Sequence, residues 1–311
     1  MQSVSAPLLR IGTRGSPLAL AQARQVQARL AAAHGVAPEA IAIVVIKTTG
    51  DAIQNRPLTE IGGKGLFTKE IEQALIDEAI DVAVHSAKDL PGELPDGLLI
   101  AACLPREDAR DAFISRKATS LAALPDGAVV GTASPRRQAL VKRLRRDLAV
   151  VPLRGNVETR LKKLAAGEVD ATLLAMAGLN RLGLSAAATA PLDIDEFLPA
   201  VGQGVIALET RGSDTATRAR LGAVGDDAAA TALAAERAFL AVLEGSCRTP
   251  IAGHARLVSG TLEFRGLIAK PDGSESFIAE RRGAPAEAAA LGRDAGSELR
   301  GRAGADFFAG E

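Results

Sequence analysis

Short apolar runs alternate with longer amphipathic stretches along the first half of the chain. Residues 8–13 and 41–47 are rich in Leu, Ile and Val and predict buried strands. Between them, apolar side chains recur every three or four positions from Ala19 to Ala33, which predicts a helix. Ser16, which a proline follows, suits the start of that helix, and Gly35 suits its end.

The order of strand-like and helical stretches then repeats. Further strands are predicted at 81–86, 129–134, 149–153 and 171–175, with helices between them. The sequence GTRGSP before the first helix is echoed by GTASP before a later one. We therefore expect an α/β fold of two similarly built lobes, in each of which helices cover a sheet.

The pattern changes from about Gly222 onward. An Ala-rich helix is followed by a loop at 244–247, two strand-like stretches around 255–269 and 275–282, and a final Ala-rich helix. This order predicts a small α+β third domain. The length of 311 residues also favours two or three domains over one.

Composition limits the class of partner. Lys plus Arg and Asp plus Glu both total 37, so the chain has no net charge with which to attract nucleic acid or an anionic membrane. Tyr and Trp are absent, which removes the usual stacking platforms for bases and sugars. The N-terminal segment lacks the pattern of a secretory signal, and no window approaches the roughly 18 apolar residues of a spanning helix. A cytoplasmic location is expected.

Arginines follow the predicted strands at positions where helices begin. Arg14, Arg136, Arg137 and Arg154 all lie there. Helix N-termini already carry partial positive charge and unpaired N–H groups, so guanidinium groups at these places lower stability unless an anion binds. Ligands of open α/β sheets bind beyond the carboxyl ends of the strands, and we expect an anion site at that edge.

Arg160 and Arg181 extend the set to six, which suits a ligand with several acidic groups. A single arginine is more often a solvated surface residue, but their shared placement favours a site. The segment GGKGLF is not a nucleotide loop, because Gly65 rather than Ser or Thr follows Lys64.

Asp89 follows the predicted strand at 81–86 and is expected at the same edge as the arginines. A carboxylate in such cationic surroundings stays ionised and suits stabilisation of a cation or proton transfer. A turn or cap residue is an equally good interpretation of an aspartate at this place. Lys88 is either a second anion contact or an exposed side chain.

The two cysteines differ in their surroundings. Cys247 lies among small residues beside Arg248, which favours an accessible, somewhat acidified thiol and hence a nucleophile. An incidental loop cysteine is the alternative. Cys103 lies in an apolar run and is expected to be buried. The three histidines are scattered along the sequence and predict no metal site, and His85 is expected to be a packed residue.

Ten segments between about residues 8 and 254 resemble the porphobilinogen deaminases in identity and order. They are RIGTRGSPLALAQ, GGKGLFTKE, DVAVHSAKDLP, REDARDAF, GTASPRRQ, LRGNVETRL, AGLNRLGL, LPAVGQGVIALE, AAERAFL and LEGSCRTPI. The resemblance implies two lobes like those of periplasmic binding proteins, with a cleft between them, and the α+β third domain. Domain 1 would comprise 1–104 and 201–221, domain 2 would comprise 105–200, and domain 3 would comprise 222–311.

The resemblance also implies a monomeric transferase of tetrapyrrole biosynthesis. Such an enzyme condenses four porphobilinogen molecules in turn on a covalent dipyrromethane cofactor and releases hydroxymethylbilane by hydrolysis, without a metal. Cys247 in LEGSC would hold the cofactor through a thioether, and Asp89 in HSAKD would be the catalytic carboxylate. The implied contacts with the cofactor, porphobilinogen and the growing polypyrrole are Arg14, Ser16, Lys88, Ser134, Arg136, Arg137, Arg154, Asn156, Arg160 and Arg181.

Two further hypotheses remain open at this point. Lys64 ends a Gly-rich stretch from Thr49 onward that is a candidate lid over the cleft. A non-catalytic protein that binds small anions, of the two-lobed receptor type, is the alternative function, although it leaves Cys247 and the third domain unexplained. Binding of nucleic acid through the arginines is disfavoured by the neutral net charge and the missing aromatic residues.

Overall fold

The computed structural model describes residues 7–52, 68–243, 249–304 and 307 of the chain. The chain divides into two compact units. Unit 1 consists of Met1–Ile53, Gly65–Arg106 and Val205–Ala230, and unit 2 consists of Gln54–Lys64, Glu107–Gly204 and Thr231–Glu311.

Unit 1 is built on a five-stranded sheet with the strand order β2-β1-β3-β10-β4. β1 (Leu9–Thr13) pairs in parallel with β2 (Ile41–Val45) and with β3 (Val82–Ser86). β10 (Ile206–Arg211) runs antiparallel between β3 and β4 (Leu98–Cys103). The parallel strands β1 and β3 are neighbours, so the residues that follow them lie at one edge of the sheet.

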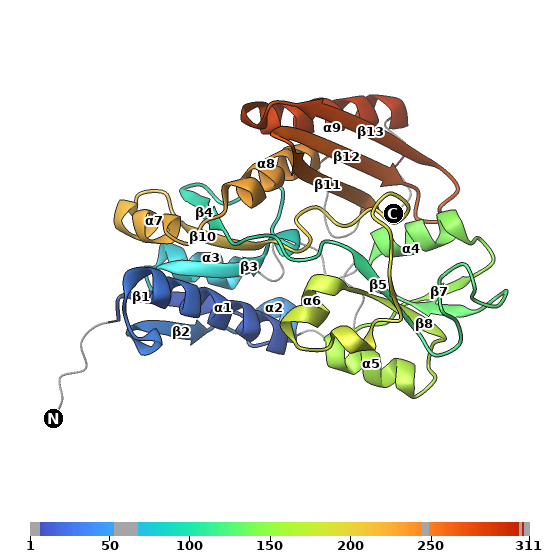
Figure 1. Ribbon diagram of the computed structural model, residues 1–311, viewed down its shortest axis with the longest axis horizontal. Helices are drawn as coiled ribbons and strands as arrows, with labels where there is room; N and C mark the ends of the chain where they lie inside the picture. The colour runs from blue at the N-terminus through green and yellow to red at the C-terminus, as the bar shows by residue number, and fades with distance from the viewer. Residues whose placement is uncertain (1–6, 53–67, 244–248, 305–306, 308–311) are drawn as a thin grey trace. The chain divides into compact units, whose positions relative to one another are not determined.

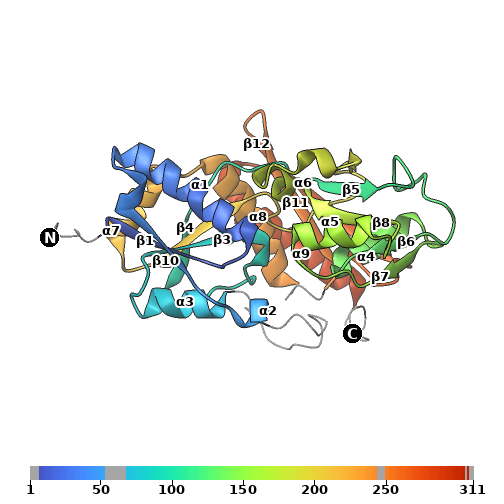
Figure 2. The same cartoon turned by 90° about the horizontal axis from the view of Figure 1, so that it is seen from below.

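Helices cover both faces of this sheet, and Figure 2 shows α1 and α3 on opposite sides of β1, β3 and β10. α1 (Pro17–His34) and α7 (Thr215–Gly222) pack on one face, while α3 (Lys69–Ile76) packs on the other. The predicted signals for α1 are confirmed: the Ser16 hydroxyl accepts from the Ala19 N–H, and Gly35 adopts a left-handed conformation with φ of 62°.

Unit 2 contains a second five-stranded sheet, with the order β7-β6-β8-β5-β9. β6 (Val129–Gly131) is parallel to β7 (Ala149–Val151) and β8 (Ala171–Ala175), and β5 (Asp111–Ser115) is antiparallel to β8 and β9 (Ala190–Pro191). Three parallel strands extended by an antiparallel pair is also the plan of unit 1. The predicted pair of similarly built α/β lobes is therefore confirmed.

The helices of this second sheet also lie on both of its faces. α5 (Val157–Ala165) and α6 (Met176–Arg181) pack on one face, and α4 (Pro135–Leu144) packs on the other. The α4 face also receives Ala252, Leu267 and Ala269 from the last sheet of the chain. That apolar contact joins the two sheets of unit 2 into one packed body.

The last sheet is an antiparallel meander of β11 (Ile251–Val258), β12 (Thr261–Ala269) and β13 (Ser276–Gly283). Figure 1 shows these strands side by side, with α8 (Asp227–Val242) and α9 (Ala288–Ala303) near them, and both helices pack on the sheet. The prediction of a single strand at 255–269 is wrong. Ser259 and Gly260 have φ of 49° and 78° and form a two-residue turn that divides it into two strands.

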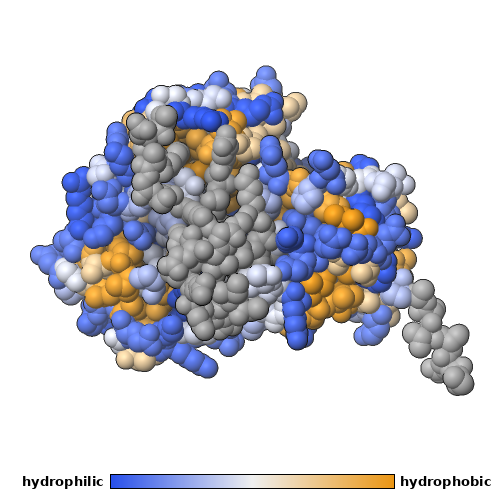
Figure 3. Space-filling view, turned by 180° about the vertical axis from the view of Figure 1, so that it is seen from behind, coloured by the Kyte–Doolittle hydropathy of each residue, from blue (hydrophilic) through white to orange (hydrophobic). Residues whose placement is uncertain are grey.

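Single helical turns complete the described chain. They are η1 (Pro38–Ala40), α2 (Thr49–Ala52), η2 (Ala87–Asp89), η3 (Ser185–Ala187) and η4 (Pro285–Glu287). Cys103 is buried at the end of β4, as predicted. Among the described residues, no helix combines the length and the apolar character needed to cross a membrane. On the face in Figure 3, apolar residues of the coloured surface form patches separated by hydrophilic ones.

The close contact between α8 and α9 depends on a residue without a side chain. A Cβ at Gly292 would overlap the carbonyl oxygen of Ala235, and backbone atoms cannot move aside cheaply. We expect Gly292→Ala to lower the free energy of unfolding by about 2 kcal/mol or more, as for an overpacked core. Gly301→Ala lies in the same helix with open space around it, so helix propensity should make it neutral or stabilising. Urea unfolding of both variants tests the contact, and equal stabilities would contradict it.

Candidate functional site

The carboxyl edge of the unit 1 sheet gathers four of the predicted site residues. Arg14 follows β1, Ser16 caps α1, and Lys88 and Asp89 lie in the single turn η2 directly after β3. Because β1 and β3 are adjacent parallel strands, their ends deliver these side chains to the same edge. All four side chains are partly exposed, so a ligand from solvent can reach them.

A pocket opens at this edge. Arg14, Ser16 and Asp89 line it, together with Gln22, His85, Ser86 and the apolar side chains around them. The Gln22 amide of α1 donates to the Ser86 hydroxyl at 2.8 Å and holds the end of β3 against the start of the helix. The pocket therefore presents one guanidinium and one carboxylate on a fixed frame, which suits a ligand that carries both negative and positive groups.

In unit 2 two predicted site residues have a structural role at the start of a helix. The Ser134 hydroxyl accepts from the N–H of Arg137 at the start of α4. The Asn156 side chain accepts from the N–H and the hydroxyl of Thr159 at the start of α5. Each cap fixes the helix N-terminus to which an arginine of the predicted site belongs.

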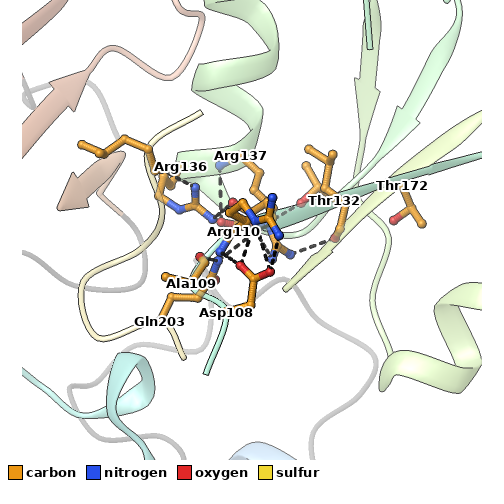
Figure 4. A network of polar contacts seen from close by, with 12 residues as sticks. Asp108, Ala109, Arg110, Thr132, Arg136, Arg137, Thr172 and Gln203 are labelled. Atoms are coloured by element: carbon orange, nitrogen blue, oxygen red, sulfur yellow. Dashed lines mark hydrogen bonds and ion pairs between the residues drawn. The ribbon is translucent and has the colours of Figure 1, made fainter. Parts of the chain in front are cut away.

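Arg136 and Arg137 are buried and share one carboxylate. Asp111, at the start of β5, has no exposed surface and accepts from Arg136 Nη2 at 2.7 Å and from Arg137 Nη2 at 2.6 Å. Gln203 reaches the same carboxylate at 3.2 Å, and Figure 4 shows its side chain beside both arginines. The sequence predicted an anion beside these two arginines, and the Asp111 carboxylate of the protein itself is part of that anion.

The balance of charge in this network remains positive. Two guanidinium groups face a single carboxylate, and burial raises the pKa of Asp111 less than the two arginines lower it, to about 2. Arg137 uses its remaining donors on the Leu173 carbonyl, while Arg136 donates to the Leu198 carbonyl and lies 5.8 Å from the Phe197 ring centroid. A buried net positive charge favours a bound anion.

Arg154 and Arg160 add to the excess. Burial lowers the pKa of the Arg160 guanidinium to about 10, and repulsion from Arg137 and Arg154 contributes to the shift. Arg160 Nε donates to the Gly155 carbonyl at 2.8 Å, and Nη1 of Arg154 is buried without a hydrogen-bond partner among the described residues. Arg160 and the two arginines that repel it, one of which has a spare donor, form a binding surface for a group with several negative charges.

Arg181 is the last residue of α6, and its contacts are separate from the Asp111 network. Its Nη2 donates to the Gly204 carbonyl at 2.8 Å, and its Nε is buried without a partner among the described residues. Burial lowers the pKa of this guanidinium, while Glu107 opposes the shift. The Glu107 side chain is itself held by the Asn180 amide at 3.0 Å.

Cys247 and Lys64 lie outside the described residues, so their predicted roles stay predictions. The arrangement of the unit 1 group relative to the unit 2 group is likewise a prediction. Sequence reasoning missed Asp111 and Gln203, although an acidic residue directly before the apolar run at 112–114 was a signal for a buried partner. Among the described residues, no group of three His, Cys, Asp or Glu side chains has the geometry of a metal site.

Comparison with known families matches nearly the whole chain. Residues 9–219 match the family model described as porphobilinogen deaminase, dipyromethane cofactor binding domain, and residues 230–301 match the porphobilinogen deaminase C-terminal domain. A porphobilinogen deaminase of Nitrobacter hamburgensis is 63% identical over 301 residues, which are 97% of this chain and 95% of the relative. One of Paracoccus denitrificans is 57% identical over 300 residues, which are 96% of each chain.

Solved structures with a related chain path are more distant. A putative methionine-binding lipoprotein of Bacillus subtilis has a TM-score of 0.42 at 14% identity, covering 70% of this chain and 89% of its own. A periplasmic substrate-binding protein of an ABC transporter from Coxiella burnetii has a TM-score of 0.42 at 16% identity, covering 70% and 92%. At these values the likeness adds nothing to the topology given above.

The Asp111 network predicts a dependence of stability on pH. The pKa of Asp111 lies below its ordinary value of 3.8, at about 2, so its contribution is present above about pH 4 and is lost as the pH falls towards 2. The lost contribution is about 2 kcal/mol, since each pKa unit is worth about 1.4 kcal/mol. In urea unfolding between about pH 5 and pH 2, Asp111→Asn should start less stable and lose less.

Glu168→Gln is the control, because Glu168 is exposed in the same unit and this variant should keep the wild-type slope. An Asp111→Asn variant that is as stable as the wild type at neutral pH and shows the same slope would contradict the network.

Proposed function

Because the chain belongs to the porphobilinogen deaminase family, we propose that its two groups of cationic side chains hold the acidic pyrroles of that family's reaction. The chain is a transferase of tetrapyrrole biosynthesis. It condenses four porphobilinogen molecules in turn, with loss of ammonia, and hydrolysis then releases hydroxymethylbilane. Membership of the family disfavours the alternative of a non-catalytic anion receptor.

The observation that carries the assignment of binding residues is the excess of positive charge around Arg137, Arg154 and Arg160. One buried carboxylate, Asp111, offsets part of it, and burial together with repulsion from Arg137 and Arg154 lowers the pKa of Arg160. Pyrroles with acetate and propionate side chains bring several carboxylates at once, which matches guanidinium groups in both number and shape. We assign Arg136 and Arg181 to the same surface, with Ser134 and Asn156 positioning it.

The residues of unit 2 fit the family's dipyrromethane cofactor. When bound, the cofactor would supply the free pyrrole α-carbon to which the first substrate is joined. We propose that Cys247 anchors it through a thioether and that the arginines of α4 and α5 pair with its carboxylates. The spare donor on Arg154 Nη1 and the net positive charge next to Asp111 support that fit.

In unit 1 we propose that Asp89 acts on the reacting atoms. Loss of ammonia from porphobilinogen leaves a cationic pyrrole, and a carboxylate in the pocket stabilises that charge by accepting from the pyrrole N–H. Asp89 also suits transfer of the proton that the attacking carbon loses when the new bond forms. Arg14, Ser16 and Lys88 bind the acidic side chains of the substrate and hold its carbon towards the growing chain.

The finer features of the family complete the proposal. We propose a monomeric, cytoplasmic chain without a nucleic-acid or membrane partner, and the three-domain division into 1–104 with 201–221, 105–200 and 222–311. The second of these domains and the third both contribute to unit 2, which contains the sheet of β5–β9 and the sheet of β11–β13. Lys64 remains a candidate for a lid.

The anchoring role of Cys247 predicts a covalent addition that can be weighed. The intact mass of the purified chain should exceed its sequence mass by one dipyrromethane, because the family's cofactor is attached covalently. Cys247→Ser should show no excess, whereas Cys103→Ser should keep it, since Cys103 is buried in β4 of unit 1. Electrospray mass spectrometry of the three proteins checks this. An excess that persists in Cys247→Ser would exclude this residue as the anchor.

The role of Asp89 predicts loss of turnover without loss of the fold. Asp89→Asn should lower kcat by about 100-fold or more, because general acid–base and electrostatic contributions are of that size. Asp96→Asn changes an exposed aspartate on the segment between β3 and β4 and should keep normal activity. Turnover of porphobilinogen is measured for both, with circular dichroism as the check on folding. Normal kcat in the Asp89 variant would remove this residue from the reaction.

A further inference from the structure

A second set of ionisable groups lies behind the pocket of unit 1. His85 of β3 is 5% exposed, Glu209 of β10 is fully buried, and Glu72 of α3 is 6% exposed. His85 and Glu209 occupy the same face of the sheet, because His85 pairs with Ala207 and Glu209 pairs with Ala83 in the antiparallel register. That face is the one that α3 covers, so the three side chains meet between the helix and the sheet.

The contacts inside this cluster leave it short of hydrogen bonds. His85 Nε2 lies 3.0 Å from Glu209 Oε2, an ion-pair distance with both side chains at least 97% buried. Neither Glu209 oxygen, nor Glu72 Oε1, has a hydrogen-bond partner among the described residues. Ile71, Leu75, Ile80 and Ala83 surround the cluster with apolar surface. Two carboxylates and one imidazole thus share a site that solvates charge poorly.

Other charged groups near the cluster are engaged elsewhere. Arg211, two residues along β10, donates to the carbonyls of Leu75 and Ile80 and pairs with Asp214. Glu70 of α3 accepts from Thr49. β4 contributes only apolar residues and Cys103 to the sheet. Arg14 and Asp89 lie at the pocket rather than in the cluster, and His85 reaches the pocket wall beside them.

The number of protons on the cluster follows from its charge. If all three groups were ionised, a net negative charge would be buried in apolar surroundings, which is strongly unfavourable. Burial raises the pKa of Glu72, and the Glu209 carboxylate raises it further, while the Thr68 hydroxyl and His85 oppose the shift. Glu72 is therefore the acid of the cluster that holds a proton most readily, and His85 Nε2 and Glu209 Oε2 lie 3.0 Å apart beside it.

We propose that Glu72, His85 and Glu209 form a proton-holding cluster that keeps the wall of the Asp89 pocket free of net negative charge, so that the pocket accepts a carboxylate-bearing ligand. The identity of that ligand as porphobilinogen rests on the proposed function. His85 and its partners are positioning residues, because they act on the potential of the pocket. A buried acid with few hydrogen bonds lowers the stability of the fold. Because this acid lies behind a binding pocket, a role in binding explains its presence.

The cluster makes binding depend on pH. As the pH rises through the raised pKa of Glu72, the cluster gains a negative charge and repels the carboxylates of the ligand. A unit charge close to a binding pocket changes the affinity of the pocket for a charged ligand by about fivefold to tenfold. We therefore expect KM to rise by that factor as the pH passes above the ordinary range of a glutamate, with a smaller change in kcat, because the repulsion acts on binding.

The kinetic test compares three proteins across this pH range. In Glu72→Gln the side chain stays neutral, so the rise in KM should disappear. Glu78→Gln changes an exposed glutamate just after α3 and should keep the wild-type rise. A wild-type KM without any rise, or an equal rise in Glu72→Gln, would overturn the proposal.

A spectroscopic test needs no activity and separates this inference from the proposed function. In glutamate-labelled protein, the carboxyl carbon shift distinguishes a carboxylic acid from a carboxylate, and the signal of Glu72 is assigned by its absence in Glu72→Gln. Glu72 should lose its proton at a higher pH in the folded chain than in the urea-unfolded chain, because it is buried beside Glu209. Titration of Glu72 at the same pH in both states would refute the cluster. A fully active Asp89→Asn would refute the role of Asp89 and leave this result standing.

Discussion

Asp111 accepts hydrogen bonds from two buried guanidinium groups at once, and the site of unit 2 depends on that shared contact. Without it, Arg136 and Arg137 would bring two unpaired charges into the interior at the start of α4. With it, one positive charge remains uncompensated, and Arg154 and Arg160 lie close enough to add to the repulsion. The fold thus tolerates a concentration of positive charge that only an anionic ligand balances fully.

Unit 1 handles charge in a different way. Its pocket carries Arg14 and Asp89 in partly exposed positions, where water screens them. The buried carboxyl and imidazole groups of unit 1 that the structure describes lie in the cluster of Glu72, His85 and Glu209 behind the pocket. There the helix α3 and the strands β3 and β10 enclose two acids and one histidine, and a retained proton removes the surplus charge. The excess positive charge of the arginines in unit 2 and the absence of net negative charge on the cluster in unit 1 both favour a ligand rich in carboxylates.

The two α/β lobes achieve this with the same construction. In each, a parallel pair of strands brings the starts of helices to one sheet edge, and a capping side chain fixes the helix there: Ser16 in unit 1, and Ser134 and Asn156 in unit 2. Capping places the arginines but does not choose their partners. In unit 2 the partner of Arg136 and Arg137 comes from the antiparallel strand β5, and in unit 1 the antiparallel strand β10 supplies Glu209 beside His85.

The sequence by itself determined the elements whose signals are local. The apolar stripe and caps of α1, the strand at 171–175 and the placement of Arg14 and Asp89 after neighbouring strands all follow from spacing and residue type. The motifs also determined the family. The Ser259–Gly260 turn was a local signal as well, and sequence reasoning missed it.

Only the tertiary structure decided which charges meet. Asp111 lies 25 residues before Arg136, and Glu209 lies 124 positions beyond His85, so no local pattern reveals either pair. Strand register and the insertion of β5 and β10 create both contacts, and burial then sets which groups keep their protons. Long-range pairing and desolvation depend on the packed fold, and for that reason the sequence named the charged side chains but not their partners.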